Sequence, residues 1–212
     1  MAKYKFGITG PFSGKVATVV GASWRGIDYM RGLPRKSGKP STEGQLRQQS
    51  KMLLFRSFLL SIGSIIEKGF QNIEQYTPMN AALSYNMKYS VAGIYPDDVV
   101  DFKELLFTQG NLFCASSAAA TSTESRELVF TWVNRAFTHL AAADDVVILV
   151  AYCPAQEKFS YLADAGIRKI GEASLTLPQS FSGHTVHCYL SFRSADEKHF
   201  SPNTYLGEVL VT

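Results

Sequence analysis

The sequence has few of the side chains on which metal sites and disulfide frameworks depend. Its 212 residues include only three cysteines and four histidines. The cysteines, Cys114, Cys153 and Cys188, are odd in number and widely spaced, which favours reduced thiols. The one local group of potential metal ligands consists of His184, His187 and Cys188. On a strand, however, the two histidines would point to opposite faces. We therefore predict no bound metal and no cofactor.

Motifs for nucleotide binding and nucleophilic catalysis are also missing. A Walker A motif fails because Gly14-Lys15 is followed by Val16, and its first glycine would fall on Thr9. No Gly-x-Ser-x-Gly elbow and no dinucleotide fingerprint is present. The acidic run Asp97, Asp98, Asp101, Glu104 lacks the spacing of a calcium-binding loop and is typical of a solvated loop. We predict that the protein is not an enzyme and takes no small-molecule substrate.

Long hydrophobic runs are absent as well. The most apolar segment, residues 52–66, is interrupted by Arg56 and several serines and is too short to span a bilayer. Lys3 and Lys5 are followed by Gly-Ile-Thr-Gly-Pro, which is not the apolar core of an export signal. We therefore expect no membrane association, and a location in the cytoplasm or within a particle assembled there.

What the sequence does contain is an uneven distribution of charge. Residues 1–56 hold 11 Lys and Arg against two acidic residues, whereas the remaining chain holds 10 basic and 16 acidic residues. The basic end is expected to bind a polyanion or an acidic protein surface, including one on a copy of the same chain.

Residues 1–40 are predicted to form a basic arm of extended and turn-rich chain. Two β-like runs, 16–20 and 24–31, are joined by Gly21-Ala22-Ser23 and predict a β-hairpin. The following segment contains Pro34 and Pro40, which bias the preceding residues away from helix. Regular apolar patterning is sparse, so the arm is expected to lack a core of its own and to lie on another surface.

Residues 41–95 are predicted to be helical. Thr42 and Gln45 have the spacing of a capping box at the start of a helix. Apolar residues then recur on one helical face: Phe55, Phe58, Leu59, Ile62, Ile65, Ile66, Phe70 and Ile73. The same face carries Lys51 and Arg47 one and two turns before Phe55. A second short helix is expected over 79–90, with Pro78 at its start.

Residues 96–212 change to a period of two, which predicts an antiparallel β-sandwich. The expected strands are 127–133, 145–153, 172–177, 185–192 and 205–211, separated by turn-rich segments. In the strand 185–192, Val186 and Cys188 share an apolar face with two further residues, and we expect the other face to be exposed. The predicted core contains Trp132, Leu175, Leu177, Val186, Leu190 and Phe192. The predicted class is α+β: a basic β-hairpin arm and a helix, followed by an immunoglobulin/fibronectin-like β-sandwich.

Two stretches of the sequence carry a resemblance to known proteins. Residues 10–52, beginning GPFSGKVATVVGASWRGIDYMRGLPRKSGKP, and the ending GHTVHCYLSFRSADEKHFSPNTYLGEVLV are similar to a family of uncharacterised bacterial proteins of about this length. The resemblance extends over nearly the whole chain and implies an intact family member. It implies no activity, cofactor or catalytic residue.

The candidate site is the set of basic and aromatic residues of the arm and the start of the helix: Lys15, Trp24, Arg25, Tyr29, Arg31, Arg35, Lys36, Lys39, Arg47 and Lys51. Our first hypothesis is a structural protein that forms homo-oligomers, its arm docking on a neighbouring subunit, as in a component of a virus-like or mobile-element particle. The second is nucleic-acid binding, because basic residues interleaved with aromatics suit a phosphate backbone and stacked bases. The third is a sandwich that serves as a protein-binding module.

Overall fold

A computed structural model describes residues 3–4, 10–24, 26–34, 38–71, 73, 76–134 and 137–212. The chain divides into two compact units, Met1–Thr42 and Glu43–Thr212. We refer to them as the N-terminal and the C-terminal unit.

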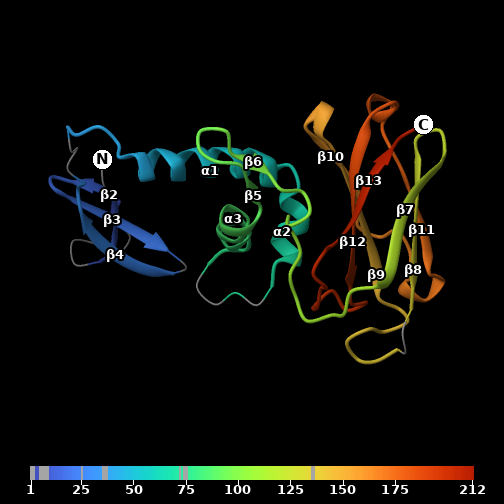
Figure 1. The fold of residues 1–212 in the computed structure, drawn as a ribbon. Coiled ribbons are helices and arrows are strands. Elements are labelled where there is room, and N and C mark those ends of the chain that lie inside the picture. The colour runs from blue at the N-terminus through green and yellow to red at the C-terminus, as the bar shows by residue number, and fades with distance from the viewer. Residues whose placement is uncertain are drawn as a thin grey trace. The chain divides into compact units, whose positions relative to one another are not determined.

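The N-terminal unit is a four-stranded antiparallel sheet in the order β1-β2-β3-β4. Its strands are β1 Lys3–Tyr4, β2 Phe12–Val16, β3 Val19–Trp24 and β4 Ile27–Gly32, drawn in blue in Figure 1. Val16 pairs with Val19, so β2 and β3 are joined by the two-residue turn Ala17-Thr18, where Ala17 has a φ of 47°. Trp24 pairs with Ile27, and Gly26 takes the left-handed conformation in that turn with a φ of 80°.

The predicted hairpin turn at Gly21-Ala22-Ser23 is wrong, because these three residues lie inside β3 and pair with β4. Gly21 is explained by close packing within the sheet and not by a turn. A Cβ at position 21 would lie 2.7 Å from the ring of Phe12, closer than van der Waals contact allows. Glycine inside a strand often marks such a close approach, which sequence alone does not distinguish from a turn.

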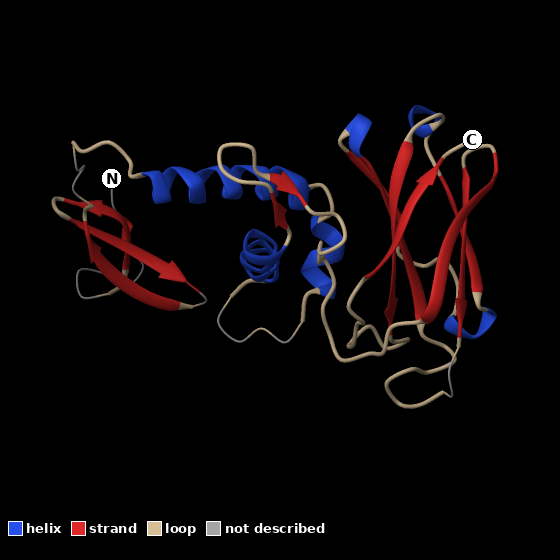
Figure 2. Cartoon of the chain, in the orientation of Figure 1, coloured by secondary structure: helices blue, strands red, loops and turns tan. Residues whose placement is uncertain are grey.

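The C-terminal unit contains a seven-stranded antiparallel sandwich (Figure 2). One sheet has the order β11-β8-β7 and the other β10-β9-β12-β13. The strands are β7 Ser116–Glu124, β8 Glu127–Val133, β9 Val146–Cys153, β10 Lys158–Leu162, β11 Glu172–Thr176, β12 Thr185–Arg193 and β13 Thr204–Leu210. Short 3₁₀ helices occupy Pro154–Gln156, Arg168–Ile170 and Gln179–Phe181. Of the seven strands in chain order, the first, second and fifth form one sheet and the others form the second sheet. This division is typical of immunoglobulin/fibronectin-like sandwiches, and the predicted α+β class is confirmed.

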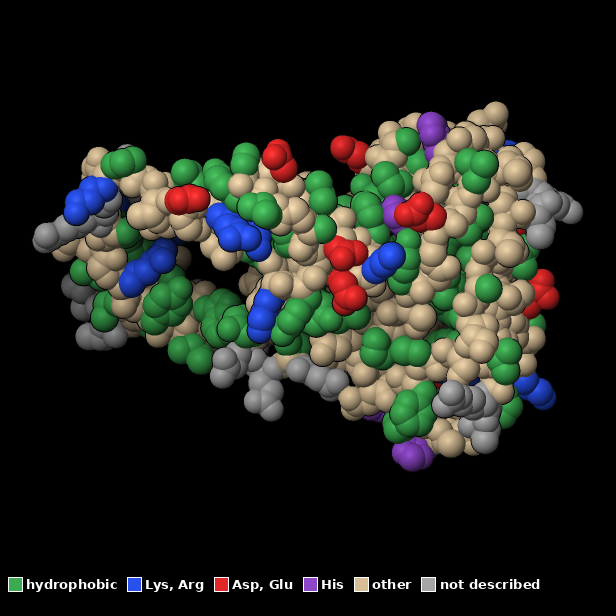
Figure 3. Space-filling view, in the orientation of Figure 1, with side chains coloured by type: hydrophobic (Ala, Val, Ile, Leu, Met, Phe, Trp, Pro, Cys, Tyr) green, Lys and Arg blue, Asp and Glu red, His purple; other side chains and the backbone are tan. Residues whose placement is uncertain are grey.

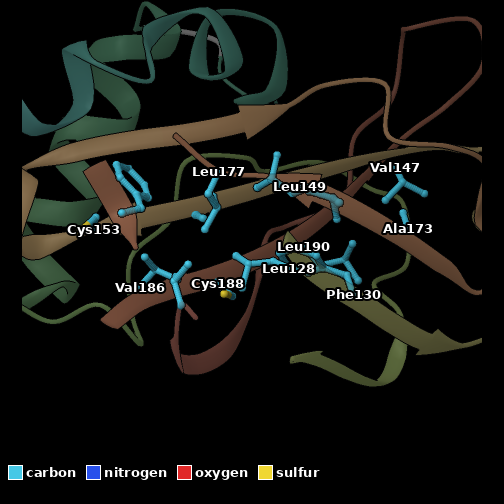
Figure 4. Close-up of a cluster of buried hydrophobic side chains, with 14 of the residues drawn as sticks. Leu128, Phe130, Val147, Leu149, Cys153, Ala173, Leu177, Val186, Cys188 and Leu190 are labelled. Carbon is cyan, nitrogen blue, oxygen red and sulfur yellow. The ribbon is translucent and has the colours of Figure 1, made fainter. Parts of the chain in front are cut away.

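The two sheets enclose an apolar core, part of which Figure 4 shows. All six core residues predicted from the sequence are buried in this cluster: Trp132, Leu175, Leu177, Val186, Leu190 and Phe192. The five predicted strands all exist. The prediction missed β7, whose Ala, Ser and Thr residues give little apolar contrast, and it also missed β10.

Helices cover the outer face of the sheet β10-β9-β12-β13. They are α1 Glu43–Leu60, α2 Gly63–Gly69 and α3 Pro78–Tyr89, and a small hairpin of β5 Val91–Ala92 and β6 Val99–Val100 follows. A second core joins Phe55, Leu59 and Ile66 of the helices to Val150 and Tyr189 of the sheet. The sheet is thus buried on both faces, and the segments expected as 41–95 and 96–212 share one core.

This arrangement corrects two predictions. The single apolar helix face is divided between α1 and α2, because the chain leaves the helix near Ser61, whose hydroxyl donates to the Phe58 carbonyl at 2.6 Å, and restarts at Gly63. The second face of β12 is not exposed: His187, Tyr189 and Ser191 are all buried. The helix predicted over 79–90 is confirmed as α3, with Pro78 in its first turn and Thr77 as N-cap.

Candidate interaction surface

The strand register of the N-terminal unit brings four of the predicted site residues to one face of its sheet. Lys15 of β2 pairs with Val20 of β3, which in turn pairs with Arg31 of β4. Paired residues of neighbouring strands point to the same side of a sheet. Lys15 and Arg31 therefore share a face and, two strands apart, lie about 10 Å from one another.

Aromatic and aliphatic side chains complete that face. Ala22 pairs with Tyr29 and Trp24 pairs with Ile27, each two residues along the strand from the pair of Val20 and Arg31. Ile27 is 65% exposed, Trp24 49% and Tyr29 44%. We call this surface the basic face: Lys15, Val20, Trp24, Ile27, Tyr29 and Arg31. Figure 3 shows Lys and Arg side chains lying among hydrophobic ones on the N-terminal unit.

The opposite face of strands β2–β4 differs in charge. Its large side chains are Phe12, Val16, Val19 and Met30, with Met30 71% exposed. Within the described part of these three strands its one charged residue is the acidic Asp28, which pairs with Ser23. The sheet therefore separates its cations from its acid, and this separation depends on the register.

The other predicted site residues lie elsewhere. Lys39 is exposed after β4, in the N-terminal unit. Arg47 is exposed and Lys51 partly buried on α1, which belongs to the C-terminal unit. Arg25, Arg35 and Lys36 lie outside the described residues. The candidate site left out Val20, Ile27 and Met30. Alternation over 27–31 could have assigned Ile27 and Met30 to opposite faces of a strand.

The N-terminal unit has almost no interior. Every residue of β4 is exposed, and among the described residues of the unit no large apolar side chain is buried. Three-stranded or larger sheets become stable when a hydrophobic face is covered. This sheet therefore has apolar surface that gains stability when another surface covers it.

In the C-terminal unit, His187 is a buried polar residue with aromatic neighbours. Its ring stacks on Phe102 with centroids 3.9 Å apart, and its Nδ1 lies 3.0 Å from the hydroxyl of Tyr205. Burial lowers the pKa of His187, while Glu208, 3.9 Å away, opposes that shift. Cys188 points to the opposite face of β12, into the sandwich core. The histidine and the cysteine are therefore held apart by the sheet itself.

A cavity of about 320 Å³ opens at one end of the sandwich, lined mainly by apolar residues that include Phe113, Val133 and Phe137. Arg168 is the one charged residue among its described lining. That guanidinium already donates to Asp145 and to the carbonyl of Phe113, at 2.9 and 2.7 Å. The groups that general acid–base catalysis needs do not converge here.

The described residues contain neither a metal-ligand cluster nor a membrane-spanning helix. No three His, Cys, Asp or Glu side chains come together there as ligands of a metal would. None of the helices in this part of the chain is long and apolar enough to cross a membrane.

The sequence of the chain matches a family described as a family of unknown function, DUF6266, over residues 11–207. The chain belongs to DUF6266. The match begins just before β2 and ends within β13, so it includes most of both units. No match was found among curated proteins.

Among solved structures, the DUF6266 chain is similar to the chicken CNTN1 FN1–FN3 domains. The identity is 11%, the TM-score is 0.38, and the match covers 49% of this chain and 35% of that one. The match thus spans about a third of the length of that chain.

Proposed function

We propose that the protein is a non-enzymatic assembly protein, whose N-terminal sheet docks on a second copy of the chain. The observation that carries the proposal is the exposed apolar surface of a sheet without an interior. Val16, Trp24, Ile27, Tyr29 and Met30 are each at least 40% exposed. A surface of this kind on so small a unit is typical of a protein–protein contact.

Charge supports a second copy as the partner. The N-terminal unit contains eight Lys and Arg and one acidic residue, a net charge of +7, whereas the C-terminal unit contains 13 basic and 17 acidic residues, a net charge of −4. Opposite charges on two units of one chain favour contacts between copies that join unlike surfaces. Such head-to-tail contacts build rings or filaments.

The edge of the sheet offers a further contact. The strand order leaves β4 at the edge, with one side of its backbone available for pairing. β4 contains no proline, one of the residues by which proteins block such pairing. Strand addition at this edge would add main-chain hydrogen bonds to the apolar contact.

The test compares the molar mass of the full chain with that of the C-terminal unit, Glu43–Thr212, by light scattering across a range of concentrations. The C-terminal unit has both hydrophobic cores, so it is expected to fold by itself. We expect the full chain to self-associate, less strongly at high salt, and the shorter chain to be a monomer. A full chain that stays monomeric at every concentration would contradict the proposal.

A second function, binding of single-stranded nucleic acid, is favoured by the composition of the basic face. Lys15 and Arg31 can contact phosphates while Trp24 and Tyr29 offer rings for stacking. Binding of a labelled oligothymidine would test it. Replacing both cations with glutamate should abolish binding if the face is the site. In the unchanged chain, these two contacts would contribute a slope of about −1.4 to log K against log salt.

A further inference from the structure

We propose that the basic face of one copy binds the acidic hairpin of a second copy. The acidic hairpin is residues 93–101, which comprise the loop from β5 to β6, β6 itself and the residue after it. This inference rests on the proposed assembly function and names the surface that the N-terminal sheet would contact. It joins two surfaces of the chain whose charges are opposite and which both expose apolar side chains.

The acidic hairpin combines carboxylates with aliphatic side chains that extend into solvent. It contains Asp97, Asp98 and Asp101 and no basic residue. Ile94 is 80% exposed and Val99 55% exposed. A loop tip with this much exposed aliphatic surface beside acids matches a face that offers cations and aromatic rings.

The carboxylates of the hairpin have few partners among the described residues, where Asp101 accepts a hydrogen bond from the backbone N–H of Lys103 at 3.0 Å. In the described part of the chain, none of the ion pairs uses Asp97, Asp98 or Asp101. By contrast, Asp164 and Glu197 both pair with Arg193. Asp98 has both oxygens shielded from solvent, with no hydrogen-bond partner among the described residues. This shielding keeps the Asp98 oxygens from a second copy, so the exposed Asp97 and the half-buried Asp101 are the carboxylates that would meet its cations.

The dimensions of the two surfaces are compatible. Lys15 and Arg31 lie about 10 Å apart across the sheet. Asp97 and Asp101 are four residues apart, a separation that extended chain limits to about 14 Å. In this arrangement each cation would face one of these carboxylates, while Ile94 and Val99 would lie against the exposed Trp24, Ile27 and Tyr29. The aromatic rings supply the apolar contact that ion pairs between exposed groups would not provide alone.

The test is a charge exchange in the full chain, with self-association measured by analytical ultracentrifugation. One variant carries Lys15→Glu and Arg31→Glu, another carries Asp97→Lys and Asp101→Lys, and a third carries all four changes. We expect each pair alone to raise the dissociation constant at least about tenfold, because like charges then meet. The fourfold variant should regain much of the affinity. Asp144→Lys with Glu172→Lys is the matched control, since both residues are exposed on the same unit and neither lines the cavity beside Val100 of the hairpin, and it should leave the constant within about twofold.

The outcomes separate this inference from the function on which it rests. If the full chain associates and Glu43–Thr212 does not, but the hairpin variant associates like the unchanged chain, the hairpin is not the partner surface and the assembly function stands. If the basic-face variant loses oligothymidine binding and keeps full self-association, the face binds nucleic acid and the inference is overturned. A full chain that is monomeric at every concentration would contradict both the inference and the assembly function.

Discussion

Arg168 and Asp145 form an ion pair inside the C-terminal unit, with Nε of Arg168 2.9 Å from Oδ2 of Asp145 and side chains that are 4% and 1% exposed. The guanidinium also lies over the ring of Phe192, 3.7 Å from its centroid. Burial raises the pKa of Asp145 and lowers the pKa of Arg168, while their mutual attraction opposes both shifts. The pair fixes the segment after β10 to the segment before β9.

Removing one partner of this pair should be strongly destabilising. We expect Asp145→Ala to lower the free energy of unfolding of Glu43–Thr212 by about 3–5 kcal/mol, because it leaves a buried guanidinium without its counter-charge. Urea denaturation measures the change. The double variant Asp145→Ala, Arg168→Met should lose less than Asp145→Ala alone. An equal or larger loss in the double variant would show that the charge is not the cause.

Trp132 is expected to be a major contributor to the sandwich core. It is 5% exposed, its ring packs edge-on to Phe192, and its indole Nε1 donates to the Arg168 carbonyl at 3.0 Å. Trp132→Ala should lower the free energy of unfolding by about 3–5 kcal/mol. Trp132→Phe keeps most of the apolar volume and should cost less. A loss below about 1 kcal/mol on truncation to alanine would contradict its placement in the core.

His187 should make stability depend on pH. Its pKa is lowered in the folded protein, so the unfolded chain binds more protons as the pH falls through the ordinary histidine range near 6.5. The contribution to stability is therefore present above that range and is lost as the pH decreases. We expect the free energy of unfolding to fall between about pH 7.5 and pH 5.5, and His187→Gln to fall less.

His199→Gln provides the control for that experiment, since His199 is exposed. Its pH profile should match that of the unchanged protein. Identical profiles for the unchanged protein and His187→Gln would show that His187 is not the group that titrates.

The three thiols should differ in reactivity. Cys114 is exposed, whereas Cys153 and Cys188 are fully buried, and burial raises the pKa of Cys188 to about 12. A thiol reagent added to the folded protein should therefore modify Cys114 at once and the other two only on unfolding, because the thiolate is the reactive form. Cys114→Ser should show no rapid reaction. Rapid labelling of a second thiol in the unchanged protein would mean that the sandwich core opens readily.

Much of the sandwich is encoded locally. The alternation in residues 127–133 and 185–192 identified β8 and β12 and assigned Val186, Cys188, Leu190 and Phe192 to the core face, because a strand exposes its two sides to different surroundings. The same reasoning failed for the other face of β12. Tyr189 lies there in the core that the helices share with the sheet, and His187 stacks on Phe102. Both covering segments are distant in the sequence, and such coverage leaves no local mark.

For the interaction surface, the sequence determined the chemistry: basic and aromatic residues concentrated near the N-terminus, with acids concentrated later. Only the tertiary structure decided which of them act together. The register through Val20 places Lys15 and Arg31 on one face with Trp24 and Tyr29, and shifting it by one residue would move β4's side chains to the other face. Composition and periodicity are properties of a segment, whereas register and coverage depend on contacts between distant segments, which is why only the fold could supply them.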